Sequence, residues 1–187
     1  MRKILSTITA VFLVCMSLAQ SNFTDVAHTT INSNWWTVNA NVQVPMATFF
    51  QTYGSSLAGD TETDFVLLKQ EQDNLGMLHS RFGQVKNGIL VEGAQFILHS
   101  RNGFVVKANG NLVRGISSQS TPSISFKQAL SIAKKELNTN SFYFENAAME
   151  TWIKTLKNDA SATFYPKEEL VLVDPNFSQQ GEKYKLA

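Results

Sequence analysis

Side chains suited to catalysis are scarce in this 187-residue sequence, which has one cysteine, Cys15, and three histidines. His28, His79 and His99 are far apart, and no His-Glu-x-x-His segment occurs, which excludes a helical zinc-hydrolase site. The sequence also lacks a Gly-x-Ser-x-Gly segment, and its carboxylates form no paired motif. These absences predict that the chain is not an enzyme by itself and holds no cofactor of its own.

The first nineteen residues have the layout of a secretory signal peptide. Two basic residues precede an apolar run from Ile4 to Met16, which is too short to anchor the chain in a bilayer. Small residues occupy the −3 and −1 positions of a cut after Ala19, so we predict cleavage there and an extracellular location. The alternative is a lipoprotein signal that uses Cys15, although Val14 is a poor fit before a lipidated cysteine.

Cleavage after residue 19 would leave 168 of the 187 residues, none of them a cysteine. A domain of that size buries a core without disulfides. The two lost basic residues take the formal charge from +1 to −1, which argues against a nucleic-acid partner. No later apolar run is long enough to serve as a stable membrane anchor.

The expected mature chain begins with residues 20–43, which are rich in asparagine, threonine and serine and predict a flexible lead-in. Trp35-Trp36 is the only bulky pair in this stretch. Pro45 then favours the first turn of a short helix. Apolar residues recur there at helical spacing, namely Met46, Phe49, Phe50 and Tyr53.

The middle of the chain carries the strongest local signal for antiparallel strands. Three Asn-Gly pairs, each beside a β-rich run, fall within 24 residues: Asn87-Gly88, Asn102-Gly103 and Asn109-Gly110. Asparagine and glycine tolerate the positive φ of type I′ turns, so we predict a chain reversal at each pair. The sequence therefore predicts an antiparallel β-meander over residues 63–114, and Gly93 within it also indicates a backbone requirement.

The last third of the chain predicts two helices followed by two strands. Ser125 to Gln128 has the form of a capping box and begins an apolar stripe that extends to Leu137. A second amphipathic stripe spans Ala147–Lys157, and strands are expected over Glu169–Val173 and Lys183–Ala187. The predicted fold class is therefore α+β. The last strand has no polar tail after it, so we expect a truncation there.

Residues Leu75 to Gln84 read LGMLHSRFGQ and resemble the first signature of the fungalysin/thermolysin propeptide domain, a His-x-Arg-aromatic-x-Gln strand. The segments Gly88–Ala94 and Val106–Leu112 are similar to the strands that follow in that family. Gly83 departs from the family pattern, in which a second glutamine is usual. The resemblance implies an antiparallel β-meander propeptide domain over residues 44–116, with a short leading helix.

Residues 122–187 are similar to the PepSY domain that comes next in these proteases. That resemblance implies a cystatin-like helix-and-sheet module, which we expect to be truncated at its last strand. The helix over Ala147–Lys157 looks like an insertion within the module. Its Trp152 is either a contact point for a partner or a core anchor, and the second interpretation is favoured.

The resemblance implies a function in binding. Such pro-regions act as intramolecular inhibitor and folding chaperone of a secreted thermolysin-like zinc metalloprotease, and the partner is the cognate catalytic domain in cis. Zinc and calcium are expected only in that catalytic domain, which is absent from this chain. Two alternatives with the same fold remain: a free-standing secreted protease inhibitor or chaperone that acts in trans, and an envelope interaction domain.

Four family-motif residues are the candidate interface: His79, Arg81, Gln84 and Glu92. Arg81 and Gln84 lie on opposite faces of a regular strand, so both cannot face the protease directly. An equally weighted alternative for Arg81 is an ion pair with Glu92 inside the pro-region. For His79 and His99, structural hydrogen bonds are favoured over a shared metal site.

Overall fold

The computed structural model describes residues 21–29, 34–117, 121–137, 139, 141–176 and 183–187. The predicted signal peptide, residues 1–19, lies outside the described residues. The helices are α1 (Phe49–Ala58), α2 (Phe126–Glu136) and α3 (Ala147–Lys157), with 3₁₀ turns η1 (Phe23–Asp25), η2 (Met46–Thr48) and η3 (Tyr143–Glu145). The strands are β1 (Ala27–Thr29), β2 (Trp35–Val38), β3 (Val44–Pro45), β4 (Thr63–Gln72), β5 (Leu78–Lys86), β6 (Ile89–Arg101), β7 (Phe104–Asn111), β8 (Val171–Val173) and β9 (Lys185–Leu186).

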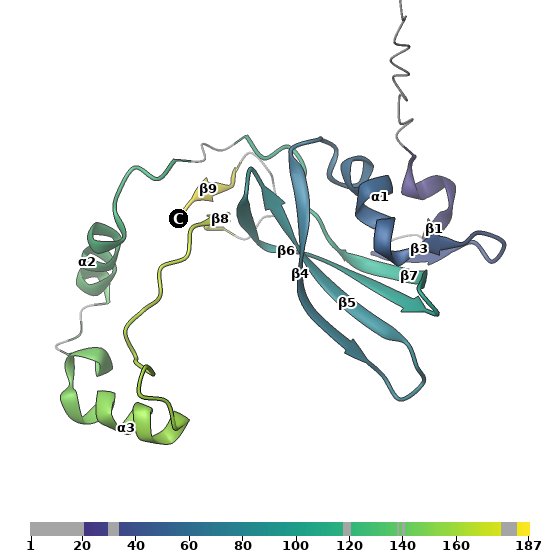
Figure 1. Cartoon of the computed structure of the whole chain (residues 1–187). Coiled ribbons are helices and arrows are strands. Elements are labelled where there is room, and N and C mark those ends of the chain that lie inside the picture. The colour runs from purple at the N-terminus through teal and green to yellow at the C-terminus, as the bar shows by residue number, and fades with distance from the viewer. Residues whose placement is uncertain (1–20, 30–33, 118–120, 138, 140, 177–182) are drawn as a thin grey trace, which may run out of the picture.

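A mixed sheet forms the body of the molecule, and its main path runs β1-β2-β7-β6-β5-β4. β4 to β7 are consecutive antiparallel strands, as the meander pattern predicts (Figure 1). Asn87-Gly88 and Asn102-Gly103 connect them, and both residues of each pair have positive φ. Local turn chemistry therefore accounts for two of the three predicted reversals.

The third Asn-Gly pair is not a turn. Asn109 and Gly110 lie inside β7 and pair with Ile97 and Phe96 of β6. Gly110 has φ 147°, and a Cβ atom there would lie 2.2 Å from the carbonyl oxygen of Gln95. Glycine is required at this position because the neighbouring backbone approaches too closely for any side chain.

The predicted flexible lead-in is wrong for the residues that the structure describes. β1 pairs with β2, and β2 pairs with β7, so residues 27–29 and 35–38 extend the sheet. Phe23 is only 1% exposed and lies against Trp36, Phe49 and Tyr53, with ring centroids 5.0–5.6 Å apart. Polar composition misled the prediction because one aromatic ring and a few backbone hydrogen bonds fix this segment.

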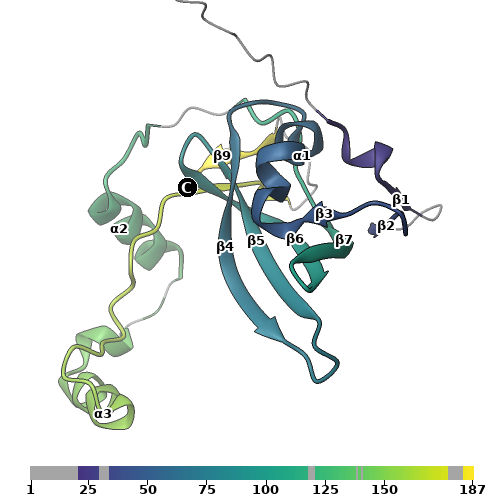
Figure 2. The same cartoon turned by 45° about the vertical axis from the view of Figure 1, so that its right-hand side comes forward.

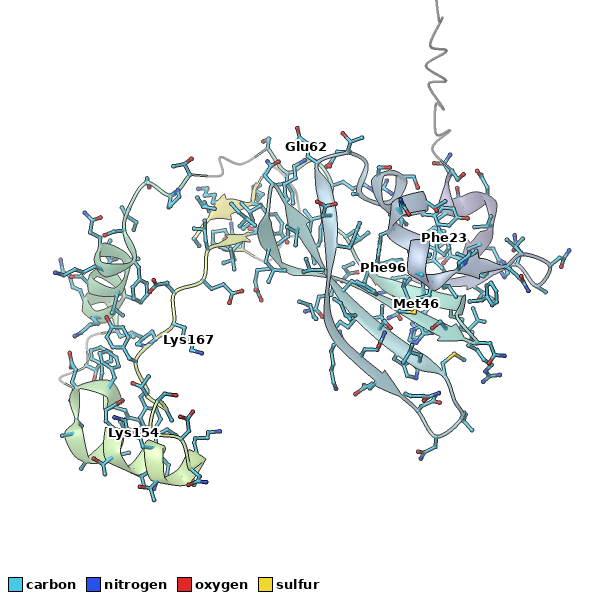
Figure 3. All side chains as sticks on the ribbon, in the orientation of Figure 1. Phe23, Met46, Glu62, Phe96, Lys154 and Lys167 are labelled. Atoms are coloured by element: carbon cyan, nitrogen blue, oxygen red, sulfur yellow. The ribbon has the colours of Figure 1, made fainter. Side chains whose placement is uncertain are left out.

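The main core lies between α1 and one face of the sheet. Phe49 of α1 packs against Phe96 of β6, and Phe50 stacks on Phe65 of β4 with ring centroids 4.0 Å apart. Figure 2 shows α1 over that face, and Figure 3 places Phe23, Met46 and Phe96 in the same body. Among the described residues, no helix covers the opposite face of the sheet (Figures 1 and 2).

A second buried cluster joins the end of the chain to the meander. Leu90 and Val91 of β6 pair in parallel with Val171 and Leu172 of β8, and β9 pairs antiparallel with β8. Gly93, with φ 76°, separates this part of β6 from the part that pairs with β7. The cluster comprises Ile89, Val91, Ala94, Val113, Ile116, Leu172 and Tyr184. The late strands therefore complete the first sheet and do not begin a second one.

Residues 121–170 form an arm that extends away from the sheet and carries α2 and α3 (Figure 1). The capping box at Ser125 and Gln128 begins α2, yet no residue of that helix is buried. Lys134 lies over the rings of Phe142 and Phe144, so the arm is held together by its own contacts. The predicted PepSY packing of helix on sheet is not confirmed, because α2 buries no residue and the late strands β8 and β9 comprise only three and two residues. No helix within the described ranges combines the length and hydropathy needed to cross a membrane.

An ion-pair cluster ties the loop between α1 and β4 to the end of β5. Lys86 is 6% exposed, and its Nζ lies 3.0 Å from Asp60 Oδ2 and 2.9 Å from Glu62 Oε2. Burial opposes the charged form of Lys86, but its bonds to Glu62 and Asp60 outweigh burial and raise its pKa. Burial likewise opposes ionised Asp60, and its hydrogen bonds, that to Lys86 first, outweigh this and lower its pKa.

Replacing Asp60 with asparagine is expected to cost about 1–2 kcal/mol of unfolding free energy near neutral pH, because a charged hydrogen-bond acceptor becomes neutral. The folded pKa of Asp60 is below its unfolded value, so its contribution is present above about pH 4 and lost as pH falls further. Urea unfolding should show the difference from wild type shrinking in acid. Glu62→Gln is the matched control and should cost less, since Glu62 is mostly exposed. A difference that stays constant down to about pH 2 would contradict the prediction.

Candidate interaction surface

The uncovered face of the sheet carries two adjacent cross-strand rows of side chains, which we call the open face. Alternation along each strand places these residues opposite the core residues. The first row contains Lys69, Arg81, Ile97, Asn109 and Trp35. The second row contains Glu71, His79, His99, Lys107 and Thr37. Cationic, imidazole and aromatic groups thus lie together on one surface.

Arg81 is exposed on the open face. Its Nη1 donates a hydrogen bond of 2.8 Å to Oε1 of Gln95, and this contact takes the place of the predicted alternative with Glu92. Glu92 is exposed on β6, and its carbonyl oxygen accepts a hydrogen bond of 3.4 Å from the Tyr184 hydroxyl. Arg81 is therefore placed where a partner could reach it, whereas the contact of Glu92 is made by its backbone.

Gln84 lies on the other side of β5 and is 1% exposed. Its Nε2 donates to the carbonyl oxygen of Val113 at 2.7 Å, and its Oε1 accepts from the Val113 amide at 2.8 Å. The pairing of β5 with β6 is irregular between Gly83 and Val85, at Gln84 itself. The amide thus replaces backbone hydrogen bonds for the segment after β7, and Gln84 has no surface with which to contact a partner.

His79 and His99 form a connected pair on the open face. Their Nδ1 atoms lie 2.6 Å apart. Nε2 of His79 lies 3.2 Å from Oδ2 of Asp73, and Nε2 of His99 lies 2.6 Å from Oδ1 of Asn109. The sequence interpretation of structural hydrogen bonds agrees with these contacts, although it did not bring the two rings together.

Trp35 was not among the predicted site residues. Its ring is stacked on that of His99, with centroids 5.1 Å apart and planes at 14°. Trp36, the next residue, packs against the main core. A strict strand alternation across the tryptophan pair would have placed one ring on each face, but the polar composition around it concealed the strand.

Electrostatics differ across the histidine pair. Partial burial lowers the pKa of His99, its bond to Asn109 opposes this, and the nearby charges of His79 and Lys107 lower it further. The pKa of Asp73 is lowered, first by the hydrogen bond from the Met77 amide and also by His79 and Leu75. Asp73 therefore stays an anion and acts only as a hydrogen-bond acceptor toward His79.

The arm presents a separate exposed surface. Trp152 is 51% exposed and stacks on Phe164, with ring centroids 6.1 Å apart and planes at 8°. The interpretation of Trp152 as a core anchor is wrong, because α3 buries only Ile153. Tyr143 and Leu156 are also exposed here.

Helix α1 covers one face of the sheet, and polar and aromatic side chains line the other. This arrangement suits a domain that binds a partner through an exposed surface. The fungalysin/thermolysin propeptide motif matches residues 63–112, which span β4 to the end of β7. The match supports a pro-region of a thermolysin-like protease and indicates that this region is not the catalytic domain. It covers 50 of the 187 residues. No curated protein matches the chain.

Proposed function

We propose that this chain is the pro-region of a secreted thermolysin-like zinc metalloprotease and acts as intramolecular inhibitor and folding chaperone of its catalytic domain. The observation that carries the proposal is the propeptide motif over residues 63–112, which coincides with the antiparallel meander. The signal-like residues 1–19 support export, and we propose from the sequence resemblance alone that residues 122–187 correspond to the PepSY domain.

The open face is the surface that we propose for the cis partner. Among the described residues it is free of helices (Figure 2). Arg81 lies near its centre, where a guanidinium can bind a carboxylate or a backbone carbonyl of the protease. Because Gln84 is buried, its role in this proposal is to hold the segment after β7 in place.

Inhibition in trans tests the proposal. The purified full chain, added in micromolar amounts to a thermolysin-like zinc metalloprotease, should slow cleavage of a peptide substrate and raise the yield of active enzyme on refolding. Arg81→Ala should weaken inhibition about tenfold, as expected for one central interface arginine. Lys127→Ala removes an exposed cation from α2 and serves as the matched control, with little expected effect.

Two results would count against parts of this proposal. Absence of both inhibition and assisted refolding would reject the pro-region function and leave an envelope interaction domain as the alternative. Equal losses for Arg81→Ala and Lys127→Ala would reject the open face as the contact surface. Inhibition without any gain in refolding would favour the free-standing inhibitor.

A further inference from the structure

The histidine pair lies on the open face, and its members and contacts come from four strands and the turn between β4 and β5. His79 belongs to β5, His99 and its stacking partner Trp35 belong to β6 and β2, and Asn109 belongs to β7. Asp73 reaches His79 from the turn between β4 and β5. This arrangement is unlike that of an isolated surface histidine, because the contacts restrict which ring nitrogens carry hydrogen.

The hydrogen positions follow from the partners. Asp73 is a carboxylate and only accepts, so Nε2 of His79 carries a hydrogen. The two Nδ1 atoms, 2.6 Å apart, require one hydrogen between them, since two lone pairs or two N–H groups at that distance repel. Asn109 completes the chain, because its amide can accept from His99 or, turned over, donate to it.

Counting protons gives two allowed states and one forbidden state. With Asn109 donating, both rings are neutral and every nitrogen has a partner. With Asn109 accepting, one ring is an imidazolium, and the pair carries a single positive charge. A second added proton places an N–H on both facing Nδ1 atoms, so the doubly charged pair does not fit this geometry.

A shared metal ion fits the distance less well than a shared proton. Two nitrogens bound to one tetrahedral zinc at about 2.0–2.1 Å lie roughly 3.3 Å apart, which is wider than the observed 2.6 Å. The described ranges also contain no group of three or more histidine, cysteine or acidic side chains arranged to hold a metal. The contact is therefore that of a proton-sharing pair.

Charged groups face the pair from every neighbouring strand. Lys69 and Glu71 of β4 form an ion pair with 2.6 Å between Nζ and Oε2, and Arg81 adds a cation from β5. Lys107 of β7 disfavours charge on His99, and the Asp73 carboxylate lies 3.2 Å from Nε2 of His79. Both signs of charge therefore surround the pair, and the 2.6 Å contact between the two rings limits how many protons the pair holds.

We propose that the His79–His99 pair makes the open face respond to pH. In the observed arrangement the pair holds at most one added proton. A second proton separates the two rings and displaces Trp35, and this weakens binding of the open face to the catalytic domain. The weakened binding to the catalytic domain rests on the proposed function. The limit of one added proton and the displacement of Trp35 concern this chain alone and are tested on it alone.

The proton response of the His79–His99 pair is tested by a nuclear magnetic resonance titration of the imidazole groups in the full chain, with tryptophan fluorescence measured in parallel. The pair should titrate in two coupled steps separated by at least about one pH unit, with the fluorescence change confined to the lower step. His79→Asn should abolish the lower step and the fluorescence change. His28→Asn, which alters the histidine outside the pair, should leave both steps intact. A single common step for His79 and His99 with unchanged fluorescence would overturn the proposal.

Asn109→Asp provides a test that keeps both imidazoles. Aspartate can only accept, so it removes the donor that the neutral pair needs and should move the upper step to higher pH by about one unit or more. An upper step that does not move would contradict the proton count and overturn the proposal.

Inhibition assays with a thermolysin-like metalloprotease test the link to the partner. Across the pH range of the lower step found in the titration, inhibition by the wild-type chain should weaken about tenfold more than inhibition by His79→Asn, as one linked proton allows. Parallel losses would overturn the link. Absence of inhibition at any pH would reject the proposed function, and the titration of the chain alone would still decide the state of the pair.

Discussion

Replacing Phe23 with alanine is expected to lower the free energy of unfolding by about 3–5 kcal/mol, the range for removing a buried aromatic ring from a packed core. The ring is 1% exposed and touches three other aromatic rings. Edge-on and tilted aromatic contacts add to the loss of buried area. Urea unfolding of the full chain measures the change.

The comparison with an exposed ring makes this test specific. Tyr143→Ala removes an aromatic side chain that is mostly exposed on the arm, and it should cost less than about 1 kcal/mol. If Phe23→Ala is equally mild, the segment before β1 does not contribute to the core. The expected result shows that residues 23–29 belong to the folded domain.

Replacing Gln84 with leucine is expected to lower the free energy of unfolding by about 2–6 kcal/mol. Leucine has a similar volume but leaves the Val113 amide and carbonyl without hydrogen-bond partners. Each buried backbone group that loses its hydrogen bond costs about 1–3 kcal/mol. Both bonds of the Gln84 amide are short and well shielded from water. The change should be visible as a lower urea midpoint with an unaltered slope.

Gln70→Leu is the matched control for Gln84→Leu. Gln70 donates one hydrogen bond of 2.8 Å to the Ser80 hydroxyl, and its own side chain is exposed on the edge strand β4. Its loss should cost less than about 1 kcal/mol. A Gln84→Leu variant as stable as Gln70→Leu would show that the segment after β7 does not depend on the amide.

Local chemistry accounts for the parts of the fold that the sequence predicts well. Asn87-Gly88 and Asn102-Gly103 turn because both residues tolerate positive φ, and Ser125 caps α2 through a side-chain hydrogen bond. Strand alternation also separates Arg81 from Gln84 correctly, with one residue exposed and the other buried. These features depend on neighbours within a few residues, so a single sequence contains them.

Features set by distant segments were not predictable from the same patterns. Gly110 looks like another turn residue, but the approach of the Gln95 backbone decides its role. The parallel pairing of β8 with β6 depends on residues about eighty positions apart. The meeting of His79 and His99 depends on the register of β5 against β6, which side-chain alternation alone does not specify.

The arm, residues 121–170, lies between two segments of one buried cluster, because Val113 and Ile116 before it pack with Leu172 and Tyr184 after it. A protease that cuts one peptide bond within the arm therefore does not release the C-terminal strands. After such a nick, the two pieces stay associated until β8 leaves β6, and the effective concentration that the intact arm supplied is lost. A single cut in the arm thus replaces the covalent link between β8 and the rest of the sheet with a noncovalent association whose extent falls as the protein is diluted.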